Sequence, residues 1–215
     1  MKFTIGCFIC ICIIIYFIYF SYYYKEGIQN RPSNIVLLGD SIFQNQNYVP
    51  NSKSIEYLLK EKLTIPSLVL AEDNAVIHNI PIQYKKLPNT MNKSSTNLYI
   101  SIGGNDLLNV YENNKINNYK LFDMVWELYK QTILNLINNT KCNVILSDIY
   151  YITDSNYTKY IPIIKKWNSN LYKFANKHNI QVFKISEILT KSKDFTNGIE
   201  PSILGGTKIV NSFIF

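Results

Sequence analysis

The stretch Asn34–Phe43, NIVLLGDSIF, carries the strongest fold signal in the chain. Its apolar run Ile35–Leu38 is short and continuous, and a Gly-Asp turn follows it at once. Runs of this kind are typical of strands that are buried on both faces, as they are in parallel sheets. The stretch therefore predicts a buried parallel strand that ends in a polar turn.

Four more apolar runs of the same kind follow, and helical patterns separate them. The runs are Leu68–Ala71, Leu98–Ile102, Val144–Leu146 and Val182–Ile185. Apolar residues recur at helical spacing over Ser54–Lys62, Tyr119–Asn138 and Ile161–Lys177. Strands that alternate with helices predict an α/β sandwich around a five-stranded parallel sheet with right-handed crossovers.

Three of the predicted strands end in polar sequences, where functional sites of open parallel sheets collect. These are Gly39-Asp40-Ser41, Glu72-Asp73-Asn74 and Gly103-Gly104-Asn105-Asp106. A Ser directly after a strand and a tight turn can present its hydroxyl beside backbone N–H groups that stabilise an oxyanion. The Gly pair lets a ligand approach the backbone, and Asn105 can donate a hydrogen bond to that ligand. The alternatives are that Ser41 caps a helix and that Asn105 and Asp106 only form a turn.

In this order, the blocks resemble those of the SGNH hydrolase superfamily, also called GDSL esterases and lipases, from about residue 34 to 209. The resemblance implies a flavodoxin-like three-layer α/β/α sandwich that hydrolyses acyl esters, with Ser41 as the nucleophile. It implies an oxyanion hole formed by Ser41, the backbone N–H of Asn74 and the side chain of Asn105. Asn74 stands at the position of a family Gly, and Asn adopts Gly-like conformations more readily than most residues. The supporting residues of the two matching blocks are Gly39, Asp40, Gly104 and Asp106.

The last block departs from the family pattern, which is D-x-x-H. Residues 194–210 read DFTNGIEPSILGGTKIV, which puts Glu200 at the position of the His and Asn197 at that of the Asp. The I-E-P-S form resembles a branch of the superfamily in which an acidic residue precedes by six positions, here Asp194. The catalytic set that the resemblance implies is therefore Ser41, Glu200 and Asp194.

Ser attack on an ester needs a base, and several residues are candidates. Glu200 can serve if burial raises its pKa toward neutrality. His78 follows the second block, with a surface or helix-cap role as the alternative. His178 is expected to stabilise a helix C-terminus, and Asp194 has backbone binding or loop capping as an alternative to chemistry.

The N-terminal segment Phe3–Tyr24 contains no charged residue. Its 22 residues would span roughly 33 Å as a helix, enough for a hydrocarbon core of ~30 Å. We predict an uncleaved single-pass transmembrane helix over residues 1–24, a linker over 25–33 and one hydrolase-like domain over 34–215. A cleaved signal peptide is the alternative, but no small-residue cleavage site follows the segment. The side of the membrane stays open, and glycosylation of the sequons at Asn92, Asn138 and Asn156 would require entry into a secretory lumen.

The composition narrows the class of protein. An apolar share of 47% argues against disorder, and four Cys in 215 residues argue against a disulfide scaffold. Neither a metal nor a cofactor is expected, because the Cys and His residues lack ligand spacing. The net charge of +7 comes from scattered Lys residues with a single Arg, so no nucleic-acid partner is expected. We expect a membrane-anchored hydrolase of a lipid or carbohydrate ester, with an inactive binding or scaffold relative as the alternative.

Overall fold

A sheet of five parallel strands, in the order β2-β1-β3-β4-β5, forms the centre of the fold. The computed structural model describes residues 13, 15, 16, 32–113 and 118–213. The strands are β1 Asn34–Gly39, β2 Ser67–Val69, β3 Thr96–Ser101, β4 Asn143–Ser147 and β5 Gln181–Phe183. Each predicted strand is confirmed, and the order is the one found in flavodoxin-like sheets.

Alternate residues of the central strands point to opposite faces of the sheet. Val36 and Leu38 of β1 are fully buried against Leu98 of β3 and the helices on one face, whereas Ile35 and Leu37 pack on the other face. The strands β1 and β3 are paired in register over the whole length of β1. Because both faces are covered, these strands read in the sequence as continuous apolar runs.

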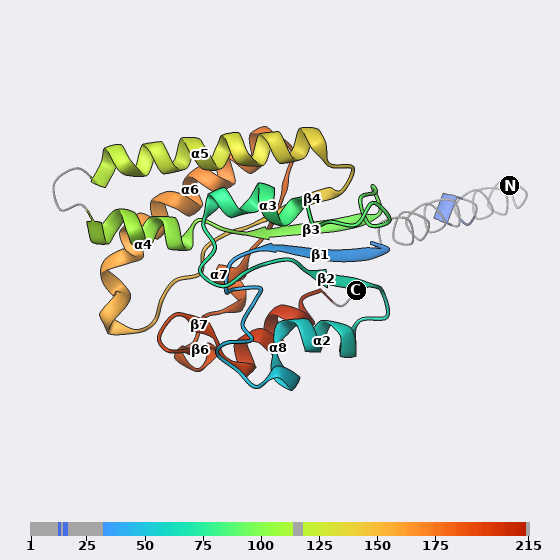
Figure 1. The fold of residues 1–215 in the computed structure, drawn as a ribbon, viewed down its shortest axis with the longest axis horizontal. Coiled ribbons are helices and arrows are strands. Elements are labelled where there is room, and N and C mark those ends of the chain that lie inside the picture. The colour runs from blue at the N-terminus through green and yellow to red at the C-terminus, as the bar shows by residue number, and fades with distance from the viewer. Residues whose placement is uncertain (1–12, 14, 17–31, 114–117, 214–215) are drawn as a thin grey trace, which may run out of the picture. The chain divides into compact units, whose positions relative to one another are not determined.

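Helices cover both faces of the sheet, so the fold has three layers (Figure 1). One layer contains α3 Ile80–Tyr84, α4 Gly104–Asn113, α5 Asn118–Asn139 and α6 Ile161–Lys177. The other contains α2 Ile55–Lys62, α7 Ile185–Ile188 and α8 Ile203–Asn211. The helical patterns of α2, α5 and α6 are confirmed as predicted.

Short elements join these layers and were not predicted from the sequence. Four are 3-10 helices: η1 Asn51–Lys53, η2 Ile77–Asn79, η3 Ser155–Tyr160 and η4 Ser192–Asp194. An antiparallel hairpin of β6 Phe195–Thr196 and β7 Glu200–Pro201 precedes α8. The second strand of the hairpin carries Glu200, which the sequence analysis names as a candidate base.

Residues 33–215 form one compact unit. Within the part of the chain that the structure describes, no helix is both long and apolar enough to cross a bilayer. The predicted membrane helix over residues 1–24 and most of the linker that follows it lie outside the described residues.

Candidate active site

Ser41 lies in a tight turn directly after β1, not in a helix. The backbone carbonyl of Asp40 accepts hydrogen bonds from the N–H groups of Phe43 and Gln44, both at 3.1 Å. Gly39, with φ +130°, begins the turn, and a Cβ atom there would lie only 1.8 Å from the carbonyl oxygen of Ser101. Only glycine allows β1 and β3 to approach so closely, and this approach sets the position of Ser41.

Gln83 of α3 fixes the backbone just before this turn. Its side chain is fully buried, accepts a hydrogen bond from the Gly39 N–H at 2.7 Å and donates one to the Gly39 carbonyl at 2.8 Å. A buried amide that satisfies both groups of one residue leaves that residue little freedom to move. Gln83 was not predicted from the sequence, although it stands as a single polar residue within the apolar segment IPIQY.

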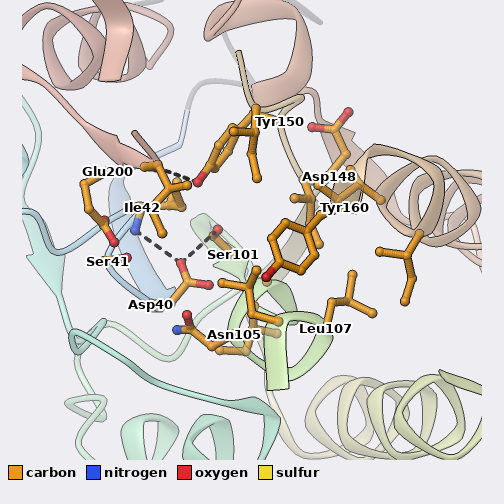
Figure 2. A pocket seen from close by; sticks show the side chains of 18 residues that line it. Asp40, Ser41, Ile42, Ser101, Asn105, Leu107, Asp148, Tyr150, Tyr160 and Glu200 are labelled. Atoms are coloured by element: carbon orange, nitrogen blue, oxygen red, sulfur yellow. Dashed lines mark hydrogen bonds between the residues drawn. The ribbon is translucent and has the colours of Figure 1, made fainter. Parts of the chain in front are cut away.

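The Asp40 carboxylate supports the turn from within. Its Oδ1 accepts hydrogen bonds from the N–H of Ile42 at 3.2 Å and from the Ser101 hydroxyl at 3.3 Å (Figure 2). Burial, helped by the nearby charge of Glu200, raises the pKa of Asp40 to about 8, although the hydrogen bonds from Ile42 and Ser101 work to lower it. Asp40 is therefore protonated at neutral pH, which makes it a positioning group and a poor proton acceptor.

The polar segments that follow β2 and β3 are hydrogen-bonded to each other next to Ser41. Asn105 Nδ2 donates to the carbonyl of Ala75 at 2.9 Å, and the Asp106 carboxylate accepts from the Ile77 N–H at 3.1 Å. Asn74, directly before Ala75, has a φ of +58°, the left-handed conformation that glycine adopts most easily. An amide nitrogen carries two N–H groups, so Asn105 keeps one for a ligand beside the Asn74–Ala75 backbone.

Glu200 of β7 lies beside Ser41 (Figure 2). Its side chain is buried, and among the described residues its Oε2 has no hydrogen-bond partner. Burial raises the pKa of Glu200, the neighbouring Asp73 raises it as well, and a hydrogen-bond contact from the Ser41 hydroxyl lowers it.

The backbone conformation of the hairpin turn accounts for an Asn at position 197, where the family has an Asp. Asn197 and Gly198 both have positive φ, 49° and 82°, between the paired residues Thr196 and Glu200. Asn and Gly are the residues that tolerate this conformation best. Asn197 thus turns the chain so that Glu200 reaches Ser41. A cavity is lined by Ser41 and Glu200, and Asn197 is not among its lining residues.

Two residues that the sequence analysis missed hold the hairpin in place. The Tyr150 hydroxyl donates to the carbonyl of Ile199, the residue before Glu200. Asn45 is fully buried, donates to the carbonyl of Pro201 at 3.3 Å and accepts from the Ile55 N–H at 2.9 Å. Nothing in the sequence around Asn45 distinguishes it in so Asn-rich a chain.

Asp194, expected as a catalytic partner of Glu200, is engaged elsewhere. Its carboxylate accepts hydrogen bonds from the N–H groups of Thr190 and Lys191, both at 3.0 Å, and pairs with the Lys208 ammonium at 2.7 Å. Burial works to raise the pKa of Asp194, but these partners together lower it. The structure therefore places Asp194 in the alternative role of backbone binding, outside the cavity that Ser41 and Glu200 line.

Neither histidine of the described chain lines that cavity. His78 is exposed in η2, and its charge acts on the nearby Asp106, whose pKa burial raises to about 6. His178 is the C-cap residue of α6, with its ring 4.7 Å from that of Phe174. The expected position of His178 at a helix C-terminus is confirmed.

One cavity brings most of the candidate residues together. It has a volume of about 50 Å³. Its polar lining consists of Asp40, Ser41, Ser101, Asn105, Asp148 and Glu200, and most of its other lining residues are aliphatic or aromatic. A hydroxyl, a buried carboxylate and an amide donor at one end of an apolar cavity form the basic set for attack on an ester carbonyl.

Comparison with known families decides the assignment. The family model of the GDSL-like lipase/acylhydrolase matches residues 35–207. The chain belongs to this family. The GDSL family consists of serine esterases and acylhydrolases, so the resemblance expected from the strand-end blocks is confirmed. Among curated protein sequences, none matches this GDSL-family chain significantly.

Solved structures share the fold of this GDSL-family chain at low sequence identity. A lipolytic G-D-S-L family protein from Veillonella parvula has a TM-score of 0.65 at 17% identity, covering 83% of this chain and 94% of its own. Phospholipase A1 from Streptomyces albidoflavus has a TM-score of 0.60 at 17% identity, covering 85% and 100%. A catalytic mutant of an acetylxylan esterase from Geobacillus stearothermophilus has a TM-score of 0.61 at 15% identity, covering 84% and 92%.

Proposed function

We propose that this chain hydrolyses acyl esters by nucleophilic attack of Ser41, with Glu200 as the base. The observation that carries the proposal is the buried Glu200 carboxyl beside the Ser41 hydroxyl, with one oxygen unpartnered among the described residues. Asp194, held by Lys208 and two backbone N–H groups, has no part in the proposed chemistry.

The reaction begins when the Ser41 oxygen attacks the ester carbonyl and Glu200 takes the hydroxyl proton. The carbonyl oxygen becomes an oxyanion, which accepts hydrogen bonds from the Asn105 amide and the backbone N–H groups of Ser41 and Asn74. Collapse breaks the bond to the alcohol, which leaves with the proton from Glu200. Water, deprotonated by Glu200, then attacks the acyl group on Ser41, the acid is released and Ser41 regains its proton.

The burial of Glu200 makes this role feasible. A carboxylate with an ordinary pKa is a weak base toward a hydroxyl, and a raised pKa strengthens it. The pKa of Glu200 is raised mainly by burial and also by Asp73. Because the base must be ionised, hydrolysis should increase with pH through the pKa of Glu200, which lies above its usual 4.5.

The test is hydrolysis of p-nitrophenyl esters by the wild type, Ser41→Ala and Glu200→Gln. We expect no turnover with Ser41→Ala, and a fall in kcat of about 10²- to 10⁴-fold with Glu200→Gln, as for loss of a general base. Glu187→Gln is the matched control, because Glu187 is an exposed carboxylate paired with Lys184. Full activity of Glu200→Gln would exclude Glu200 as the base, and ligand binding without turnover by the wild type would favour the inactive-scaffold alternative.

We also propose that the chain is held at a membrane by its N-terminal segment. The support is the sequence alone, namely the 22 uncharged residues Phe3–Tyr24. The ester would then be presented at or near a membrane surface. The sequons at Asn138 and Asn156 are exposed, so both are open to glycosylation if the domain enters a secretory lumen.

A further inference from the structure

A surface groove lies between α5 and α6, two helices of the same layer (Figure 1). It has a volume of about 450 Å³. Its main lining residues recur three or four positions apart on each helix, so each set shares one helix face. They are Trp126, Lys130 and Leu134 on α5 and Lys173, Phe174 and Lys177 on α6.

The floor of the groove is aromatic and apolar. The half-buried ring of Trp126 is stacked on Tyr129, with centroids 5.3 Å apart, and meets Trp167 edge to face at 5.0 Å. Phe174 is buried, and Leu134 is half-buried. The neighbouring rings hold Trp126 in place while part of it faces the groove. Fixed aromatic side chains of this kind supply much of the binding energy at protein interfaces.

The rim of the groove is basic. Lys173 and Lys177 are exposed on α6, and among the described residues neither has an ion-pair partner. Lys130 of α5 pairs with Glu127 at 2.7 Å, and Glu127 is the one acidic residue in the groove lining. Three ammonium groups thus surround a single carboxylate, which leaves the rim positive.

The end of α6 accounts for only part of this charge. Lys177 in the last turn and His178 at the C-cap stabilise the partial negative charge of the helix C-terminus. This effect is confined to the last turn, so it explains neither Lys173 nor Lys130 of the neighbouring helix. With Trp126 in the floor, these charges fit a ligand that has an apolar face and acidic flanks.

The length and depth of the groove favour a helix as that ligand. Between Trp126 and Leu134 the groove follows α5 for roughly 12 Å, about two helical turns. A helix that lies in such a groove inserts apolar side chains spaced three or four positions apart. A bilayer is contacted by apolar side chains that protrude from a protein, whereas Trp126 and Phe174 are sunk between two helices.

We propose that this groove binds an acidic amphipathic helix of a partner protein. Apolar side chains of that helix pack on Trp126 and Phe174, and its Asp or Glu residues pair with Lys173 and Lys177. The opposite charges steer the partner and set its orientation. The proposal is independent of the proposed hydrolysis, because the groove and the cavity beside Ser41 share no lining residue.

Intrinsic fluorescence tests the proposal, because the two Trp residues of the chain, Trp126 and Trp167, are in contact at the groove floor. The full chain in a neutral detergent is titrated with a Trp-free helical peptide of about four turns, with Leu on one face and Glu on the other. We expect a saturable change in emission that Trp126→Phe strongly reduces, since Trp167 is fully buried. A peptide with Gln in place of Glu should bind at least about tenfold more weakly. Equal affinity for both peptides would overturn the proposal.

Charge reversal locates the binding surface. The double variant Lys173→Glu and Lys177→Glu should raise the Kd of the Glu peptide at least about tenfold. The matched control is Lys53→Glu with Lys193→Glu, which changes the net charge equally at exposed Lys residues outside the groove. Equal weakening by both double variants would show that the peptide responds only to net charge, and would contradict binding in the groove.

Two other occupants are separated by the same measurements. An emission change caused by phosphatidylserine in the micelles, but not by the Glu peptide, would assign the groove to a lipid. Self-association that the Lys173→Glu and Lys177→Glu variant abolishes, without peptide binding by the wild type, would assign it to a second copy. Either result would overturn the proposal. Ser41→Ala should bind the Glu peptide as the wild type does, whether or not the chain hydrolyses esters.

Discussion

Asp40 stands directly before the nucleophile and carries the most perturbed carboxyl of the cavity. Burial raises its pKa to about 8 from the ordinary 3.8. The folded protein therefore holds a proton on Asp40 over a pH range in which the unfolded chain has released it. Over that range, raising the pH destabilises the fold.

We predict that the free energy of unfolding falls between about pH 4 and pH 8, and that Asp40→Asn makes this fall shallower. The contribution of Asp40 is at most about 1.4 kcal/mol for each pH unit. Denaturant unfolding at several pH values measures the slope. Asp123→Asn, on an exposed carboxylate, is the control. Equal slopes in the wild type and Asp40→Asn would show that Asp40 does not hold a proton in the fold.

At the residue scale, the sequence predicted the polar residues that directly follow strands. It did not predict the residues that hold these polar residues in position. Ser41 and Asn105 could be assigned because parallel strands end at one edge of the sheet. Glu200 could be assigned as a candidate base because it stands at the position of the family His in the last block. Asp194 shares that block, but its carboxylate is turned to Lys208 and to backbone N–H groups. Such choices of partner depend on packing between distant segments, which sequence spacing does not reveal.

Among the elements, α8 depends on a close contact that only glycine permits. Gly205 lies in its first turn, where a Cβ atom would be 2.1 Å from the carbonyl oxygen of Asp194. The Ser202 side chain caps the helix by accepting from the Gly205 N–H at 3.2 Å. This approach places η4, the hairpin and α8 around Glu200. Two adjacent glycines also weaken the helical pattern, which is why α8 was not predicted.

We predict that Gly205→Ala destabilises the protein by about 2 kcal/mol or more, because the added methyl group meets backbone. Its Tm should fall by about 4–8 °C for a domain of this size. Gly104→Ala is the matched control, since the nearest atom to its added Cβ, Asp40 Oδ2, is 3.9 Å away. Thermal unfolding followed by circular dichroism compares the two, and equal Tm values would contradict the close contact at Gly205.

For the whole molecule, the five-stranded parallel sheet was predictable from the alternation of apolar runs and helical patterns, and the proposed membrane anchoring rests on the sequence of the N-terminal segment alone. The α/β architecture was predictable because strands buried on both faces are apolar throughout and α2, α5 and α6 are amphipathic. The hairpin and the cavity were not, because they are formed by segments far apart in the chain. Net charge, by contrast, carried no information about the site.

We predict that the full chain stays in the membrane pellet after an alkaline carbonate wash. The 22 uncharged residues Phe3–Tyr24 are long enough to cross the hydrocarbon core, and insertion of such a helix is effectively irreversible. A chain that lacks residues 1–24 should appear in the supernatant. Release of the full chain by the wash would contradict membrane anchoring.

The central claim is that Ser41 is an activated nucleophile, and a fluorophosphonate probe tests it most directly. The probe should form a covalent adduct that mass spectrometry locates on Ser41 in the wild type, with no adduct in Ser41→Ala. Labelling should be slower in Glu200→Gln and should quicken as the pH rises through the pKa of Glu200. A folded wild-type protein that never labels at Ser41, at any pH in that range, would contradict the account.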